Sequence, residues 1–274
     1  MALLLLLWLI TSGIGSLPAW GQSTFDLYGS ARASGLADAT TGLHGDAGVQ
    51  ANPGLRGFSP SRTLVFYARE TYGLSELRYG AVHLGMPVRT AHLSVGAGTF
   101  GFEDYREVHL NGGLAAAVPV GTTRRLGLGV NARYHHLRIP GYGRAGALTL
   151  NIGIAAQVLP ALTLGSHATN VLAARLSGGG DLPQTLAVGL GYAAAESIVV
   201  VVDAFKDIDF PLALRGGIEL RPVRAFAIRA GATSEPVRFT VGSGISVGPV
   251  AADLAAEQHA DLGWSPSAAL TVSW

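Results

Sequence analysis

Three groups of side chains in this 274-residue chain have residue types that perform catalysis or bind metals in other proteins. Ser166, His167 and Asn170 have the composition of a hydrolase triad. Ser166 and His167 are adjacent, however, and adjacent residues of a strand point to opposite faces, so they cannot form a nucleophile and base pair. The doublet His135-His136 is divided in the same way and makes a poor metal site. The sequence therefore predicts no catalytic residue and no enzyme activity.

A third group is acidic. Asp203, Asp207 and Asp209 fall where the pattern predicts an outer loop, and carboxylates on flexible loops can bind calcium. The cluster lacks the glycine spacing of a known calcium loop, so we interpret it as a solvated loop and predict no metal and no cofactor. The absence of cysteine excludes disulfide and thiolate chemistry, and a formal net charge of +1 gives no argument for a nucleic-acid partner.

The elements that would position any site are short strands. The chain is 49% hydrophobic and only 14% charged, yet it has no apolar run long enough to span a membrane as a helix. From residue 61 onward, apolar and polar residues alternate in about 14 segments, as in a bacterial outer-membrane β-barrel with an even number of strands. Clear examples are 62–69, 126–136, 148–158, 186–192, 212–220, 226–232 and 237–247. The 38 glycines suit the interior of a narrow barrel.

The connections between these segments alternate in length. Short turns are predicted near residues 119–121, 159–160, 195–196, 222–223 and 248–249. Longer connections are predicted at 139–144, 170–184, 206–210 and 259–265. Short periplasmic turns and longer outer loops are typical of outer-membrane barrels. The fold class predicted is therefore all-β, a transmembrane antiparallel barrel of residues 61–274.

The two-residue period also assigns faces. In segment 237–247 it directs Val237, Phe239 and Val241 outward and Arg238 inward. Because a charge facing lipid is costly, the charged positions of this and neighbouring segments are predicted to face the lumen. This predicted lumen wall comprises Arg133, Arg215, Glu219, Arg229, Arg238, Asp253 and Glu257.

The last segment ends on an aromatic residue. Leu270, Val272 and Trp274 share one face, as in the terminal strands of outer-membrane barrels. We expect them to form the signal through which barrel-assembly machinery inserts the chain, with the lipids of the outer membrane of a diderm bacterium as its surroundings.

The first 60 residues differ in texture. Residues 1–21 contain an apolar run from Leu3 to Ile10 and the small-residue pattern Ala19-Trp20-Gly21, which predict a signal peptide cleaved before Gln22. Residues 22–60 show little alternation and are about the size of a plug or hatch. Within them, Asn52-Pro53 is expected to shape a turn. Asp46 is expected to pair with a lumen arginine such as Arg133 or Arg215.

Four ordered blocks of sequence resemble the PorV/PorQ proteins and their FadL-like relatives among outer-membrane barrels. Residues 31–55 read ARASGLADATTGLHGDAGVQANPGL, similar to that family's opening ending in N-P-A-x-L. Residues 168–192 (ATNVLAARLSGGGDLPQTLAVGLGY) and 212–233 (LALRGGIELRPVRAFAIRAGAT) are similar to its middle blocks. Residues 253–274 (DLAAEQHADLGWSPSAALTVSW) are similar to its ending. Gly54, Leu220 and Pro266 depart from the family pattern.

The resemblance implies a 14-stranded FadL-like barrel with an N-terminal hatch, and it leaves two functions open. A PorV/PorQ-like barrel would bind or pass on exported proteins that carry a C-terminal signal domain, in type IX-like secretion. A FadL-like barrel would take up hydrophobic small molecules. The first function predicts a protein partner at the outer loops, and the second predicts a bound hydrophobic ligand.

Overall fold

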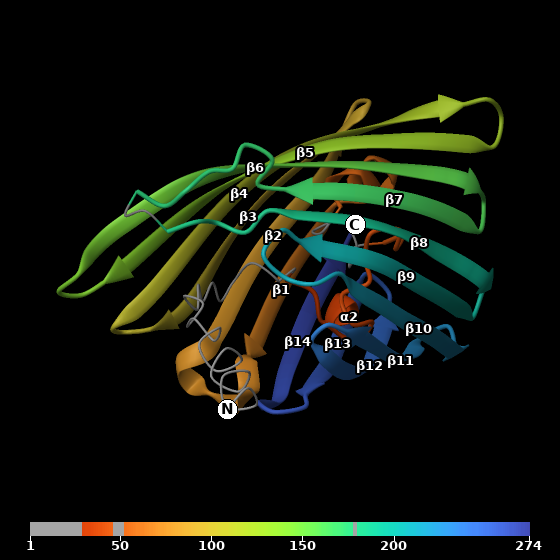
Figure 1. Ribbon diagram of the computed structural model, residues 1–274. Helices are drawn as coiled ribbons and strands as arrows, with labels where there is room; N and C mark the ends of the chain where they lie inside the picture. Colours follow the sequence, from red (N-terminus) through yellow and green to blue (C-terminus); the bar gives the residue numbers. More distant parts are fainter. Residues whose placement is uncertain (1–28, 46–51, 178–179) are drawn as a thin grey trace, which may run out of the picture.

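The computed structural model describes residues 29–45, 52–177 and 180–274, and its main element is a closed antiparallel β-barrel (Figure 1). The predicted signal peptide and Asp46 lie outside these ranges. Fourteen strands of the described residues pair in sequence order, and β14 returns to pair with β1, from Thr63 opposite Ser273 to Arg69 opposite Ser267. The strands are β1 (Thr63–Glu70), β2 (Arg78–Val88), β3 (Ala91–Phe102), β4 (Tyr105–Val120), β5 (Arg124–Ile139), β6 (Gly143–Leu159), β7 (Leu162–Thr169), β8 (Thr185–Ala195), β9 (Ile198–Asp207), β10 (Ala213–Val223), β11 (Phe226–Ser234), β12 (Val237–Val247), β13 (Val250–His259) and β14 (Gly263–Ser273).

Alternation of apolar and polar residues determines which side of each strand faces out. In β12, Val237, Phe239 and Val241 are each more than half exposed on the outer surface, while Thr240 between them is buried inside. The other strands repeat this pattern, so large apolar side chains cover the outside and polar or small side chains fill the inside. An apolar outer band with a polar interior is the arrangement of transmembrane barrels. The predicted strand number and the predicted faces of β12 are confirmed.

The connections differ between the two ends of the barrel. At the short-turn end, consecutive strands are joined by as few as two residues, such as Pro160-Ala161 between β6 and β7. At the long-loop end, residues 170–184 form the longest connection, and residues 71–77 contain the short helices η2 (Thr71–Gly73) and η3 (Ser75–Leu77). β4, β5 and β6 have 16, 16 and 17 residues and project beyond their neighbours at this end (Figure 1).

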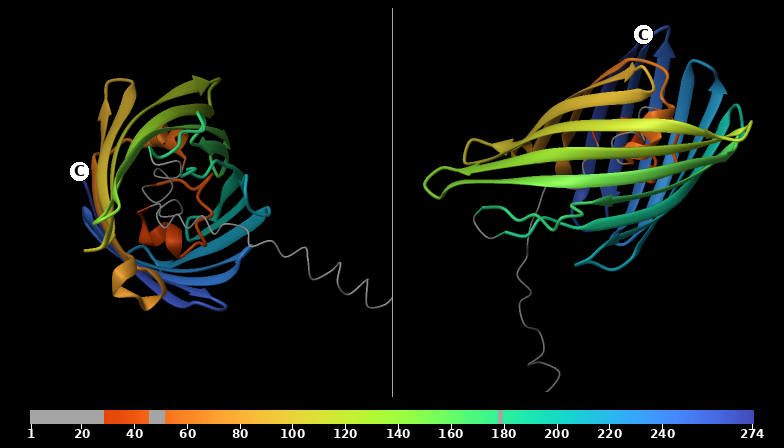
Figure 2. Two further views of the ribbon diagram at one scale, coloured as in Figure 1. Left: turned by 60° about the vertical axis from the view of Figure 1, so that its left-hand side comes forward. Right: turned by 90° about the horizontal axis from the view of Figure 1, so that it is seen from above.

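The described part of the N-terminal region lies within the ring of strands, as the view along the barrel shows (Figure 2). We call residues 29–45 and 52–58 the inner segment. It contains α2 (Ala31–Ser34) and η1 (Pro53–Phe58), both of them very short. No helix among the described residues is long and apolar enough to cross a membrane.

Candidate functional site

The inner segment is held in shape by local caps. Ser30 begins α2, and its hydroxyl accepts a hydrogen bond from the Ala33 amide. Asn52 begins η1, with Pro53 in the first position, where a missing N–H costs nothing. The Asn52 carboxamide accepts from the Gly54 amide at 2.9 Å and donates to the carbonyls of Thr41 at 2.8 Å and Ile154 at 3.1 Å. Asn52 therefore joins both parts of the inner segment to strand β6.

Glycines on seven strands allow the inner segment to lie directly against the barrel wall. At each of them a Cβ would come closer to an inner-segment atom than an ordinary van der Waals contact. Gly217 of β10, for example, would place a Cβ 2.9 Å from Cα, Cβ and Cδ2 of Leu36. The glycines are Gly127, Gly129, Gly153, Gly165, Gly191, Gly217, Gly231 and Gly242. They explain much of the glycine content inside the barrel, since a larger residue at these positions would push the segment away.

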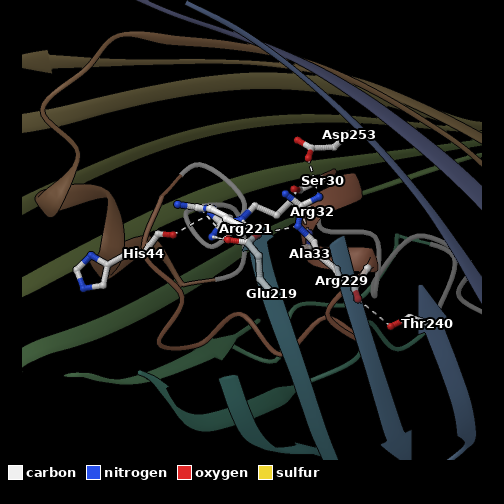
Figure 3. A network of polar contacts seen from close by, with 10 residues as sticks. Ser30, Arg32, Ala33, His44, Glu219, Arg221, Arg229, Thr240 and Asp253 are labelled. Carbon is white, nitrogen blue, oxygen red and sulfur yellow. Dashed lines mark hydrogen bonds and ion pairs between the residues drawn. The ribbon is translucent and has the colours of Figure 1, made fainter. Parts of the chain in front are cut away.

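A charged network ties the inner segment to strands β10, β11 and β13 (Figure 3). Arg32 donates from Nε and Nη2 to the two carboxylate oxygens of Glu219, at 2.7 and 3.0 Å. Arg229 donates to the same carboxylate at 2.7 Å and to Asp253 at 2.7 Å, and Arg221 donates to it at 2.6 Å. Glu219 is fully buried, so its charge is compensated by three guanidinium groups rather than by bulk water.

A second ion-pair group surrounds Glu257 of β13. Arg69 donates to Glu257 at 2.9 Å and Arg238 donates at 3.2 and 3.3 Å. Asp38 of the inner segment lies near this group, and burial together with the charge of Glu257 raises its pKa to about 6. The charges of Arg69, Arg215 and Arg238 oppose that rise. Burial therefore keeps the pKa of this inner-segment acid well above the usual range of an aspartate.

Asp203 corrects the predicted acidic loop. It lies in β9, points into the barrel and is 2% exposed, whereas Asp207 ends that strand and Asp209 follows it. Its carboxylate accepts hydrogen bonds from the Thr41 amide at 2.9 Å and the Thr41 hydroxyl at 2.7 Å. The expectation was wrong because Asp203 occupies an inward position within the strand, between Val201 and Phe205. It fixes the middle of the inner segment.

The remaining predicted site residues fall as follows. The structure brings Glu219, Arg229 and Asp253 together in one network and Arg238 with Glu257 in the other. Arg215 is buried with its guanidinium 3.7 Å from the centre of the Phe205 ring. Arg133 faces inward on β5, beside Asn111 and Thr149 on the neighbouring strands.

The C-terminal residues, and the residues that the sequence excludes from catalysis, lie on the faces of the barrel that apolar/polar alternation predicts. Leu270 and Trp274 are exposed on the outer face. His167 points inward and is buried, whereas its neighbour Ser166 lies on the opposite side of β7. No group of three or more acidic or histidine residues within the described ranges is arranged to hold a metal ion.

An aromatic cluster lies beyond α2, toward the long-loop end. Tyr67, Tyr79 and Phe100 are buried together, and Leu77 and Tyr105 pack against them. The Tyr67 and Tyr79 rings meet edge to face, with centroids 5.8 Å apart. A hollow of about 520 Å³ lies on the outer face of the neighbouring strands, and it is lined mainly by outward positions such as Ala68, Leu254 and Pro266.

Sequence reasoning missed Arg32, Thr41 and the contact glycines. Arg32 lies in a stretch without alternation, and nothing in the sequence indicated that its partner is 187 residues away. The glycines carried a usable signal, because Gly127, Gly129, Gly217 and Gly231 occupy the same alternate positions as the polar lumen residues of their strands.

Comparison with known proteins shows which solved structures share the fold of this barrel. No protein-family model and no curated protein sequence matches the chain. Among solved structures, the toluene transporter TodX of Pseudomonas putida aligns with a TM-score of 0.59 and 13% identity, over 92% of this chain and 98% of that chain. The barrel has the FadL-like fold. The toluene transporter TbuX of Ralstonia pickettii gives 0.58 and 14%, over 91% and 98%.

A Pseudomonas aeruginosa FadL homologue aligns with a TM-score of 0.55 and 12% identity, over 89% of this chain and 96% of that chain. At these identities the likeness concerns the fold. The strand number expected from the resemblance to FadL-like barrels is confirmed by the FadL-like fold. The aligned structures support the FadL-like part of the resemblance and do not show its PorV/PorQ part.

Proposed function

We propose that this protein is an outer-membrane channel that takes up small hydrophobic molecules and whose lumen is closed by its N-terminal inner segment. The observation that carries the proposal is the placement of that segment, anchored through Arg32, Thr41 and Asn52 to the wall of a closed barrel of FadL-like fold. A barrel plugged in this way does not act as an open pore, so a transported molecule needs a specific route past the plug.

The chemistry near the long-loop end supports a hydrophobic ligand. Tyr67, Tyr79 and Phe100 form a buried aromatic cluster inside the barrel, where most other inward positions are polar or small. Two structures of the same fold are described as toluene transporters. These findings favour uptake over the type IX secretion role, which predicts a protein partner at the outer loops and for which the described residues offer no comparable feature.

Uptake can be tested in a diderm host that lacks its own hydrocarbon channel, with toluene as the probe and a toluene-responsive reporter inside the cell. Expression of the wild-type protein should raise the reporter signal above that of cells with an empty vector. Phe100→Ala should reduce the signal because it removes a buried ring of the cluster. Val95→Ala, on the outer face of the same strand, is the matched control and should leave it unchanged.

The proposal would be wrong if cells that contain folded wild-type protein in their outer membrane respond no faster than empty-vector cells. It would also be wrong if Phe100→Ala and Val95→Ala had the same effect. Recovery of a co-purifying exported polypeptide, in place of a hydrophobic ligand, would instead return support to the secretion role.

A further inference from the structure

A separate pocket of about 230 Å³ lies inside the mouth formed by the short turns. Its walls come from the β10–β11 turn, from inward positions of β11 to β14 and from the beginning of the inner segment. Four arginines and one acid line it: Arg32, Arg221, Arg224, Arg229 and Asp253. None of the aromatic residues of the long-loop end reaches this pocket, so it is a different site from the one proposed for uptake.

Among the described residues, the positive charges around this pocket outnumber the negative ones. Glu219 and Asp253 accept hydrogen bonds from Arg32, Arg221 and Arg229, so two carboxylates serve three guanidinium groups. The Glu219 carboxylate already accepts four hydrogen bonds, which is about the capacity of its two oxygens. Arg224 adds a fourth positive charge and makes no hydrogen bond or ion pair with any residue in the described part of the chain.

We propose that this pocket binds a small free oxyanion, such as inorganic phosphate, that enters through the short-turn mouth. An oxyanion there would accept hydrogen bonds from Arg224 and from the guanidinium N–H groups of Arg221 that Glu219 does not use. Guanidinium groups suit this role because their planar set of donors matches the oxygens of phosphate and carboxylate groups. Ser246 and Thr271 supply hydroxyl groups to the same lining.

One further acidic residue, Glu196, lies close enough to these arginines to weaken anion binding. Glu196, in the β8–β9 turn, lines a neighbouring pocket of about 430 Å³ that shares Arg221 and Arg224 with the first. Its charge weakens the attraction of these two arginines for an anion, since like charges repel. The proposal therefore predicts opposite effects for two substitutions in the same region. Arg224→Gln should weaken phosphate binding, and Glu196→Gln should strengthen it.

The experiment is calorimetric titration of the folded, lipid-free protein in detergent with inorganic phosphate at constant ionic strength. Wild-type protein should show saturable binding. Arg224→Gln should raise the dissociation constant by about tenfold or more, because it removes a charged hydrogen-bond donor. Arg124→Gln is the matched control: it removes the same charge from the same end of the barrel, on an exposed residue outside the pocket.

Absence of saturable phosphate binding would overturn the proposal, and so would equal weakening by Arg224→Gln and Arg124→Gln, which indicates general charge attraction. A third arm uses nanodiscs that contain either a phosphate-headgroup lipid or a neutral glycolipid. Arg224-dependent binding of the lipid without binding of free phosphate would assign the pocket to a headgroup and overturn the free-oxyanion proposal. Arg224 is exposed and forms no hydrogen bond or ion pair with a described residue, so its variant should fold and leave the outcome interpretable.

Discussion

Replacing Gly217 with alanine tests whether the inner segment lies against the wall as described. A Cβ at Gly217 would lie 2.9 Å from the Cα of Leu36, about 0.5 Å inside an ordinary contact of 3.4 Å. Leu36 is fully buried and packs on Val201, so neither its backbone nor its side chain has room to retreat. Overpacking of this kind costs about 1–3 kcal/mol. The neighbouring Gly216→Ala is the control, since its Cβ would meet only a carbonyl oxygen at 3.8 Å.

The assay is limited trypsin digestion of the folded barrel in detergent, followed at the bond after Arg56. Arg56 belongs to the inner segment and is 5% exposed, so cleavage there requires the segment to leave the wall. A loss of 1–2 kcal/mol increases the open population, and hence the cleavage rate, by roughly 5- to 30-fold. Gly216→Ala should behave like wild type. Equal cleavage rates for Gly217→Ala and Gly216→Ala would refute the packing that we describe.

Three further predictions concern single polar side chains. Glu219→Gln should lower the free energy of unfolding in urea titrations by about 3–5 kcal/mol, because it leaves buried guanidinium groups without a counter-charge. Glu70→Gln is the control: Glu70 pairs with Arg78 in a largely exposed ion pair, and its loss should cost about 1 kcal/mol or less. Equal losses would contradict this. Asn52→Ala should cost about 1–3 kcal/mol and speed cleavage at Arg56, since buried carbonyls lose their donor; an unchanged rate would argue against its anchoring role. The Asp38 pKa of about 6 exceeds its unfolded value of 3.8, so the stability of the wild-type protein should fall as pH rises from about 4 to 6. Asp38→Asn should abolish that fall. Above pH 6 the variant should be more stable than the wild-type protein by at most about 3 kcal/mol. A pH profile identical to that of wild type would exclude Asp38 as the cause.

The barrel could be predicted from the sequence because its strands follow a simple local rule. Alternation directs Val237 and Phe239 outward and Glu219 and Arg229 inward, and it needs no knowledge of neighbouring strands. The same rule would have placed Asp203 inside, at an alternate position with Val201 and Phe205. The sequence nevertheless favours a loop, because the acidic residues that follow Asp203 suggest a single solvated cluster.

The inner segment could not be traced in the same way. Its contacts with the wall join residues far apart in the sequence, such as Thr41 and Asp203, which are 162 residues apart. A local sequence pattern cannot predict such pairs. The prediction of a turn at Asn52-Pro53 agrees with the observed cap of η1, but the carbonyls that Asn52 bonds belong to Thr41 and to β6. Which arginine pairs with which carboxylate in the two ion-pair groups likewise depends on the register between strands, and the sequence does not specify that register.

If the inner segment closes the lumen of this barrel, the closure determines ion conductance in a planar lipid bilayer. We expect the wild-type protein to pass almost no current under applied voltage, because the segment is bound to the wall through Arg32, Thr41 and Asn52. A variant without residues 23–60 should conduct steadily. Continuous ion conductance by the wild-type protein would show that the inner segment does not close the lumen.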